Sequence, residues 1–249
     1  MFGFRRKKVE INGVQVLDEI ENAMYAHLKP LGFRKFGRTL HRFVSEDISQ
    51  VVHFQLEKDT FCVNTGIRVP ECVDRVFVSP IDKTYYHEYE CNIRSRLGAV
   101  RSYRETWFDL SKNREKIIRS ILQELDRIVI PAFEVLNSRE AILAHRRAYP
   151  RMDTMNWQMI LLEECMIYGH LGDLDKAKEL FEEYYRQRQE EYEKLRINGQ
   201  KVYLKKGERV VYFDQDITAD KNGYVTLYNA NYEHLDYLGE LARKLGLRA

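Results

Sequence analysis

Two neighbouring stretches of alternating apolar and polar side chains constrain the fold of this chain most strongly. Residues 51–56 and 61–67 each alternate at every second position, and a short polar segment, residues 57–60, separates them. Side chains on a strand point to opposite faces of a sheet with a period of two. The pattern therefore predicts a β-hairpin made of two half-buried strands.

One register of this hairpin collects the apolar side chains on a single face. On this face Leu56 pairs with Phe61, Phe54 with Val63, and Val52 with Thr65. The same register places His53 opposite Asn64, and Gln55 opposite Cys62, on the second face. A slip of one residue would mix apolar and polar side chains on both faces, so the pattern favours this register.

The polar side chains of the second face have two interpretations. They are a set of hydrogen-bonded groups, because buried polar groups usually satisfy one another, or they form a binding or catalytic site with His53, Gln55 and Asn64. We expect the first, with His53 in a structural role and Asn64 as its hydrogen-bond partner. The sequence leaves open whether His41 shares this face, so a two-histidine site is a side hypothesis.

Arginines of a later predicted strand, within residues 91–103, suggest an anion-binding patch. Arg94 and Arg96 share one face if this strand is regular, and Arg68 follows the earlier hairpin. Guanidinium groups bind carboxylates and phosphates through two parallel hydrogen bonds. The alternative is a solvated sheet face on which the charges only contribute solubility.

Two amphipathic helices are predicted, one on each side of the sheet segment in sequence. Residues 14–30 and 113–130 carry apolar side chains at the three-and-four spacing of one helical stripe. Each stripe needs a partner, and the apolar face of the hairpin offers one. We therefore expect an α+β fold in residues 1–136, in which both helices cover one face of an antiparallel sheet.

Several segments of this region share the pattern of a known family: residues 31–39, 53–55, 61–67 and 94–98, and Trp107. A Gly-Phe helix end rich in basic residues is followed by an Asn-Phe-Gln-like strand, a Phe-x-Val-Asn-x-Gly strand and an arginine-containing strand. Over residues 14–136 the chain resembles the bacterial domain-of-unknown-function 4304 family. His53 stands where an asparagine is commoner in that family. The resemblance implies an α+β fold and no particular chemistry.

The remaining residues, 137–249, are predicted to form a second region packed on the first. Residues 155–168 and 174–195 indicate a helical hairpin, which resembles a single tetratricopeptide unit at Cys165, Tyr168, Gly172, Ala177 and Phe181. No second copy occurs at the repeat period, so an ordinary helical hairpin is favoured. Short strands at residues 201–204, 209–213 and 224–228 and a last helix from Asn231 complete this region.

The composition argues against a nucleic-acid-binding protein and a membrane-spanning protein. The chain of 249 residues has a net charge of +2, so we expect no nucleic-acid partner. It contains neither a membrane-length apolar run nor a signal segment at its start. None of its four cysteines forms a CxxC pair, so we expect reduced, unpaired thiols in a cytosolic protein. These cysteines are Cys62, Cys72, Cys91 and Cys165.

The sequence contains no P-loop, GxGxxG, HExxH or GxSxG motif. We therefore expect no cofactor and no metal ion. The leading hypothesis is a non-enzymatic cytosolic protein that binds another protein, because residues 70–90 form a long loop rich in aromatic side chains. The alternative is a hydrolase-like or nucleotide-handling enzyme that uses His53, Asn64 and Gln55 beside the arginines. The oligomeric state and the identity of the partner do not follow from the sequence.

Overall fold

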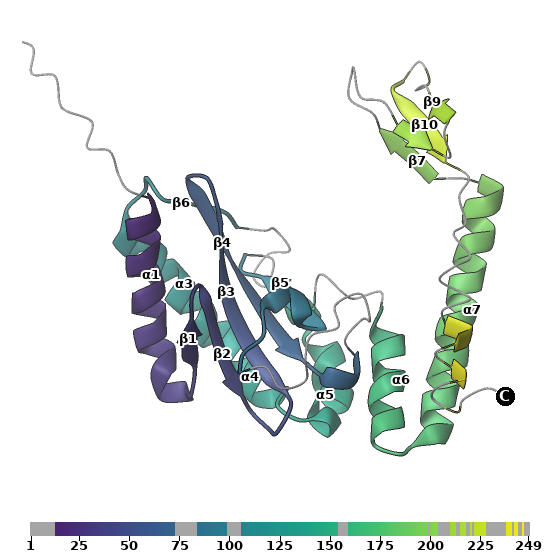
Figure 1. Ribbon diagram of the computed structural model, residues 1–249, viewed down its shortest axis with the longest axis horizontal. Helices are drawn as coiled ribbons and strands as arrows, with labels where there is room; N and C mark the ends of the chain where they lie inside the picture. The colour runs from purple at the N-terminus through teal and green to yellow at the C-terminus, as the bar shows by residue number, and fades with distance from the viewer. Residues whose placement is uncertain are drawn as a thin grey trace, which may run out of the picture. The chain divides into compact units, whose positions relative to one another are not determined.

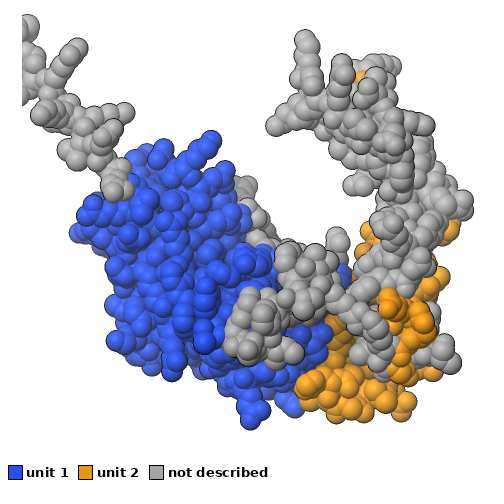
Figure 2. All heavy atoms as spheres, in the orientation of Figure 1, with its two compact units in different colours: residues 1–163 blue, residues 164–249 orange. Residues whose placement is uncertain are grey.

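The structure is a computed structural model that describes residues 13–72, 84–98, 106–153 and 159–198, and short pieces of the chain from residue 200 to residue 246. The chain separates into two compact units, residues 1–163 and 164–249 (Figure 2). A compact unit is defined by its contacts and need not fold alone. The domain division at residue 136 therefore stays a prediction.

The first unit is built on a six-stranded antiparallel sheet (Figure 1). Its strands are β1 (Arg34–Phe36), β2 (Thr39–Phe43), β3 (Ser49–Glu57), β4 (Thr60–Arg68), β5 (Ile93–Arg96) and β6 (Phe108–Asp109). Five strands follow one another in the order β1–β2–β3–β4–β5. The short strand β6 pairs with the first two residues of β4, and β5 pairs with the second half of β4.

The central hairpin has the predicted register. Phe54 pairs with Val63, and His53 pairs with Asn64. A two-residue loop connects the strands, and its first residue, Lys58, adopts a left-handed conformation with φ 52°. Phe54 and Val63 are fully buried. The alternating pattern therefore predicted the pairing and the apolar face correctly, but β4 is buried on both faces and not half-buried.

Helices cover the apolar face of this sheet, as Figure 1 shows beside β1 and β2. The helical elements are α1 (Gly13–Leu28), η1 (Lys29–Leu31), α3 (Arg114–Glu124), η5 (Leu125–Val129) and α4 (Ile130–Val135). Gln50, which shares the face of Val52 and Phe54, donates a hydrogen bond from Nε2 to the Phe133 carbonyl oxygen at 2.6 Å. The α+β fold with helices on one face of the sheet is confirmed.

The helix expected over residues 113–130 begins as predicted and ends later. The side chain of Asn113 accepts a hydrogen bond from the Lys116 N–H at 3.0 Å, which is a typical N-cap. At η5 the chain forms a π-helical turn, in which the Ile130 N–H donates to the Leu125 carbonyl oxygen. Pro131 follows and has no N–H to donate. The wider turn makes room for the proline ring, so the helix continues as α4.

Short helices follow α4: α5 (Arg139–His145), η6 (Arg146–Ala148) and η7 (Pro150–Met152). They surround a buried ion cluster. Arg146 is 1% exposed, and its Nη2 atom lies 2.5 Å from both Asp153 Oδ2 and Glu163 Oε2. The carboxyl groups of Asp153 and Glu163 therefore share one buried guanidinium group.

The second unit contains most of α6 (Ile160–His170) and all of α7 (Leu174–Asn198). The predicted helical hairpin is present. Gly172 turns the chain with φ 84°, and Asp173 Oδ1 accepts the Lys176 N–H at 3.1 Å. No helix among the described residues is long and apolar enough to span a membrane.

Two small antiparallel pairs follow α7. They are β7 (Gln200–Tyr203) with β10 (Tyr224–Leu227), and β8 (Val210–Tyr212) with β9 (Gln215–Ile217). The turn before β10 contains Gly223 with φ 83°. Most of the last helix predicted from Asn231 lies outside the described residues.

Candidate functional site

The second face of the sheet carries the predicted site residues. The strand register aligns its side chains in four rows: Phe43–Ser49–Arg68, His41–Val51–Gly66–Arg94, Thr39–His53–Asn64–Arg96, and Gln55–Cys62. All six candidate site residues therefore share one face. His41 shares it too, which the sequence left open, and it lies one row from His53.

Residues 84–91, which we name the covering loop, pack on this face through the short helix η4 (Glu88–Glu90). Glu88 Oε1 accepts hydrogen bonds from Asn64 Nδ2 at 3.4 Å and from Arg94 Nη2 at 3.1 Å. Glu90 Oε2 accepts the backbone N–H of His87 at 2.8 Å. Glu88 thus binds the covering loop to the sheet, and Glu90 stabilises the loop by a hydrogen bond within it.

The hydrogen-bond partner of His53 differs from the expected one. Its Nδ1 atom lies 2.9 Å from Thr39 Oγ1, so its partner is the cross-strand neighbour on β2 rather than Asn64 on β4. The same Thr39 hydroxyl lies 3.4 Å from Nδ1 of His87 in the covering loop. Burial lowers the pKa of His53, and the nearby Glu88 carboxylate opposes this shift.

Asn64 and Gln55 belong to a closed polar network. Asn64 Nδ2 donates to Gln55 Oε1 at 3.1 Å, and Arg96 Nε donates to Asn64 Oδ1 at 2.8 Å. The Cys62 thiol donates to Gln55 Oε1 at 3.6 Å. The Arg96 guanidinium also lies 5.1 Å from the centre of the Trp107 ring. These amide groups therefore already bind one another.

The three predicted arginines share the second face but have different surroundings. Arg94 forms an ion pair with Glu88, and Arg96 belongs to the amide network. Arg68 is 4% exposed, and its guanidinium carbon lies 3.8 Å from the centre of the Tyr86 ring. Within the described part of the chain, no carboxylate lies within ion-pair distance of Arg68.

Exposed and half-buried aromatic rings gather on the covering loop and the neighbouring strands β1 and β2. Tyr89 is 47% exposed and stacks on His87 at 5.1 Å, and Tyr85 stacks on Phe36 at 4.5 Å. Phe43, at the end of β2, is 43% exposed. We name these five residues the aromatic surface. The sequence indicated the loop from its aromatic content, but only the fold brings Phe36 and Phe43 beside it.

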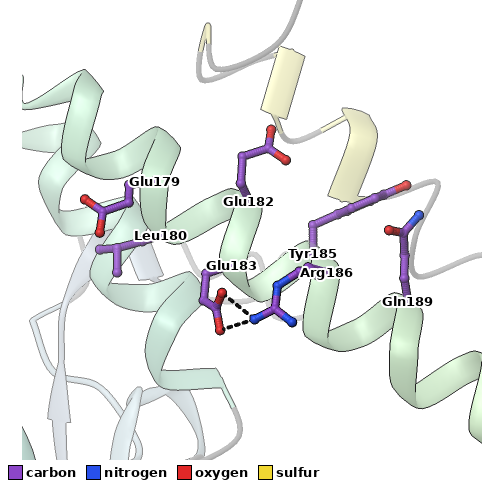
Figure 3. A pocket seen from close by; sticks show the side chains of 7 residues that line it. All are labelled: Glu179, Leu180, Glu182, Glu183, Tyr185, Arg186 and Gln189. Carbon is purple, nitrogen blue, oxygen red and sulfur yellow. Dashed lines mark hydrogen bonds and ion pairs between the residues drawn. The ribbon is translucent and has the colours of Figure 1, made fainter.

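A shallow hollow lies along α7 in the second unit (Figure 3). It is lined by Glu179, Leu180, Glu182, Glu183, Tyr185, Arg186 and Gln189. Arg186 Nη2 lies 2.6 Å from Glu183 Oε2, and its Nη1 atom lies 2.7 Å from Glu190 Oε1. The charge of this arginine is therefore already paired within the helix.

The cysteines do not offer a reactive thiol. All four are free and buried, in agreement with the expectation of unpaired thiols. Burial raises the pKa of Cys91 and Cys72, and it raises the pKa of Cys165 to about 12. Because the thiolate is the nucleophile and the metal ligand, burial makes Cys72, Cys91 and Cys165 poor nucleophiles. The described residues contain no group of three or more side chains that could hold a metal ion.

Residues 24–135 match a family model described as Domain of unknown function (DUF4304). Over this segment the chain is similar to the DUF4304 family. The match confirms the resemblance inferred from the sequence motifs. The DUF4304 segment includes all six predicted site residues, the covering loop and the aromatic surface. No match was found among the curated proteins or among the solved structures.

Proposed function

We propose that the DUF4304 domain of this chain is a non-enzymatic protein-binding module that contacts its partner through the aromatic surface. The observation that carries the proposal is the exposure of Tyr89 and Phe43, which are 47% and 43% exposed. Tyrosine and phenylalanine are enriched in protein interfaces, where a few aromatic anchors supply most of the binding energy.

The rigidity of the covering loop supports this proposal. Tyr89 stacks on His87 with an angle of 12° between the rings, and the His87 N–H is bound by Glu90. Tyr85 stacks on Phe36 of the edge strand with an angle of 7°. Because these side chains are already ordered, binding would cost less conformational entropy than it would for a free loop.

The enzyme alternative receives less support. The Thr39 hydroxyl lies within hydrogen-bond distance of His53 and His87, as a nucleophile lies beside its base in many enzymes. Thr39 is fully buried, however, and a nucleophile needs an open approach for its substrate. Asn64 and Gln55 are engaged with each other. We therefore favour binding over catalysis.

Site-specific photo-crosslinking tests the proposal. Tyr89 or Tyr224 is replaced in turn by the photo-reactive benzoylphenylalanine, and the tagged chain is irradiated in cells that express it. Tyr224 lies in the second unit and is 43% exposed, so it is a matched control for Tyr89. Crosslinked species are compared by mass spectrometry.

The proposal predicts a specific protein crosslinked from position 89 and not from position 224. Crosslinking should also be lost when Phe43→Ser is added to the position-89 variant, because Phe43 belongs to the same surface. The same proteins crosslinked equally from both positions would contradict the proposal. Hydrolytic or nucleotide-dependent activity that is lost in His53→Ala would favour the alternative.

A further inference from the structure

Buried polar atoms without partners gather on the second face of the sheet. On this face, four such atoms of the described residues have no hydrogen-bond partner: His41 Nε2, Ser49 Oγ, Arg68 Nε and Arg94 Nε. An unpaired buried polar atom loses its hydration without compensation. A cluster of them on one face needs an explanation, and a ligand that supplies the missing bonds is one.

Two of these residues, Arg68 and His41, lie beside a single ring. The Tyr86 ring lies 3.8 Å from the Arg68 guanidinium carbon and 5.8 Å from the His41 ring, measured to ring centres. Ser49 is the direct cross-strand neighbour of Arg68. Phe43 lies at the other end of this row and is 43% exposed, so the row opens to solvent there.

The charged groups that act on His41 are Arg68 and Glu90. Arg68 has a positive charge and no carboxylate within ion-pair distance in the described chain. Glu88 is paired with Arg94, and Glu90 Oε2 accepts the His87 N–H. Burial, followed by the Arg68 charge, lowers the pKa of His41 to about 4, while Glu90 opposes the shift. At neutral pH the cluster of Arg68, Ser49 and His41 therefore has one positive charge.

We propose that Arg68, Ser49 and His41 form a binding site for a carboxylate group beneath Tyr86. The Nε edge of the guanidinium donates to the carboxylate oxygens, as arginine does in bidentate pairs. The Ser49 hydroxyl and the neutral His41 ring donate further hydrogen bonds. One positive charge matches a carboxylate better than a phosphate dianion. The carboxylate belongs either to a small acid or to the end of a peptide chain.

Nuclear magnetic resonance of the arginine side chains tests this inference on the full chain. The Nε–Hε signals of ¹⁵N-labelled protein are followed at neutral pH during titration with sodium acetate, and in parallel with chloride and phosphate. Arg68→Lys identifies the signal of Arg68, and Arg119→Lys, at an exposed helix position, is the control. An acetylated dipeptide with a free carboxyl end and its amide separate the two sources of the carboxylate.

We expect a saturable shift of the Arg68 signal with acetate or with the acid dipeptide. Arg68→Lys should weaken binding about tenfold or more, because it removes a charge-assisted bidentate pair. Ser49→Ala should weaken it by a smaller factor, and Arg119→Lys should not. Thermal melting shows whether each variant is folded. If Arg68→Lys does not fold, the binding measured for Ser49→Ala still tests the site.

A shift that does not saturate, or that chloride reproduces, would overturn the inference. Tighter binding of phosphate than of acetate, or equal binding of the amide dipeptide, would overturn the assignment to a carboxylate. The crosslinking from Tyr89 does not depend on these results, so a failure of this site leaves the proposed aromatic surface to its own test.

Discussion

Gly66 on β4 lies directly beneath Cys91 of the covering loop. A Cβ atom on Gly66 would lie 2.6 Å from Cys91 Cβ and 2.7 Å from Cys91 Sγ, which is closer than such atoms approach. Glycine therefore lets the loop backbone approach the sheet at this row. This contact, together with the hydrogen bonds of Glu88, holds the covering loop on the second face.

Gly66→Ala should therefore destabilise the protein by about 1–3 kcal/mol, as overpacking of a tight core does. Urea unfolding measures the change. Cys91→Gly removes the atoms that clash, so the double variant should recover part of the loss. Gly169→Ala is the control, because a Cβ at Gly169 meets no atom within 4 Å. Equal effects of Gly66→Ala and Gly169→Ala on the free energy of unfolding would contradict the close contact between Gly66 and Cys91.

His53→Ala should destabilise the chain because the buried Thr39 hydroxyl loses its nearest partner. We expect a cost of about 1–2 kcal/mol, which is typical for an unpaired buried polar group. Thr39→Val together with His53→Ala should cost less than the sum of the single changes. Additive costs in urea unfolding would contradict the Thr39–His53 bond.

The neutral state of His41 predicts a pH dependence of stability. The pKa of His41 is about 4 in the folded chain, because burial disfavours the charged ring, and near 6.5 in the unfolded chain. Between these values the unfolded chain binds more protons, so stability falls as the pH is lowered from 6.5 towards 4. His41→Phe should remove about 1–2 kcal/mol of the difference in unfolding free energy between pH 7 and pH 5. An unchanged difference would contradict the prediction.

The raised pKa of Glu163 predicts that stability depends on pH with the opposite sign. Burial raises its pKa to about 8, and Asp153 adds to this shift, while Arg146 opposes it. The folded chain therefore holds a proton that the unfolded chain releases near pH 4.5, so this contribution to stability is lost as the pH rises through 8. Thermal melting between pH 6 and pH 9 should show a smaller loss for Glu163→Gln than for wild type. Glu140→Gln, at an exposed position, should behave as wild type does.

The sequence predicted the parts of the fold that depend on local periodicity. The two-residue period of the central hairpin gave its register, because one slip would have buried polar side chains. The apolar stripe of residues 113–130 predicted a helix. The π-helical turn before Pro131 was missed, because a proline inside a helical pattern usually marks its end and the wider turn has no local signal.

The site was harder to predict because its contacts join distant segments. The sequence placed His53 opposite Asn64 correctly but not its bond to Thr39, because the length of the turn before β3 was ambiguous by one residue. The contact between His87 and Thr39 depends on how residues 84–91 pack on the sheet, which has no local signal in the sequence of these residues. Gly66 was the available signal, since a glycine in a strand often marks the close approach of another segment.

The affinity of the crosslinked partner for three forms of the chain tests the central claim most directly. Wild type, Tyr89→Ala and Tyr224→Ala are compared by calorimetry, after melting curves confirm that each is folded. Because an aromatic hot spot contributes about 2 kcal/mol, we predict that Tyr89→Ala raises the Kd about tenfold or more, while Tyr224→Ala leaves it within about twofold. An unchanged Kd for Tyr89→Ala, or an equal loss in both variants, would contradict binding through the aromatic surface.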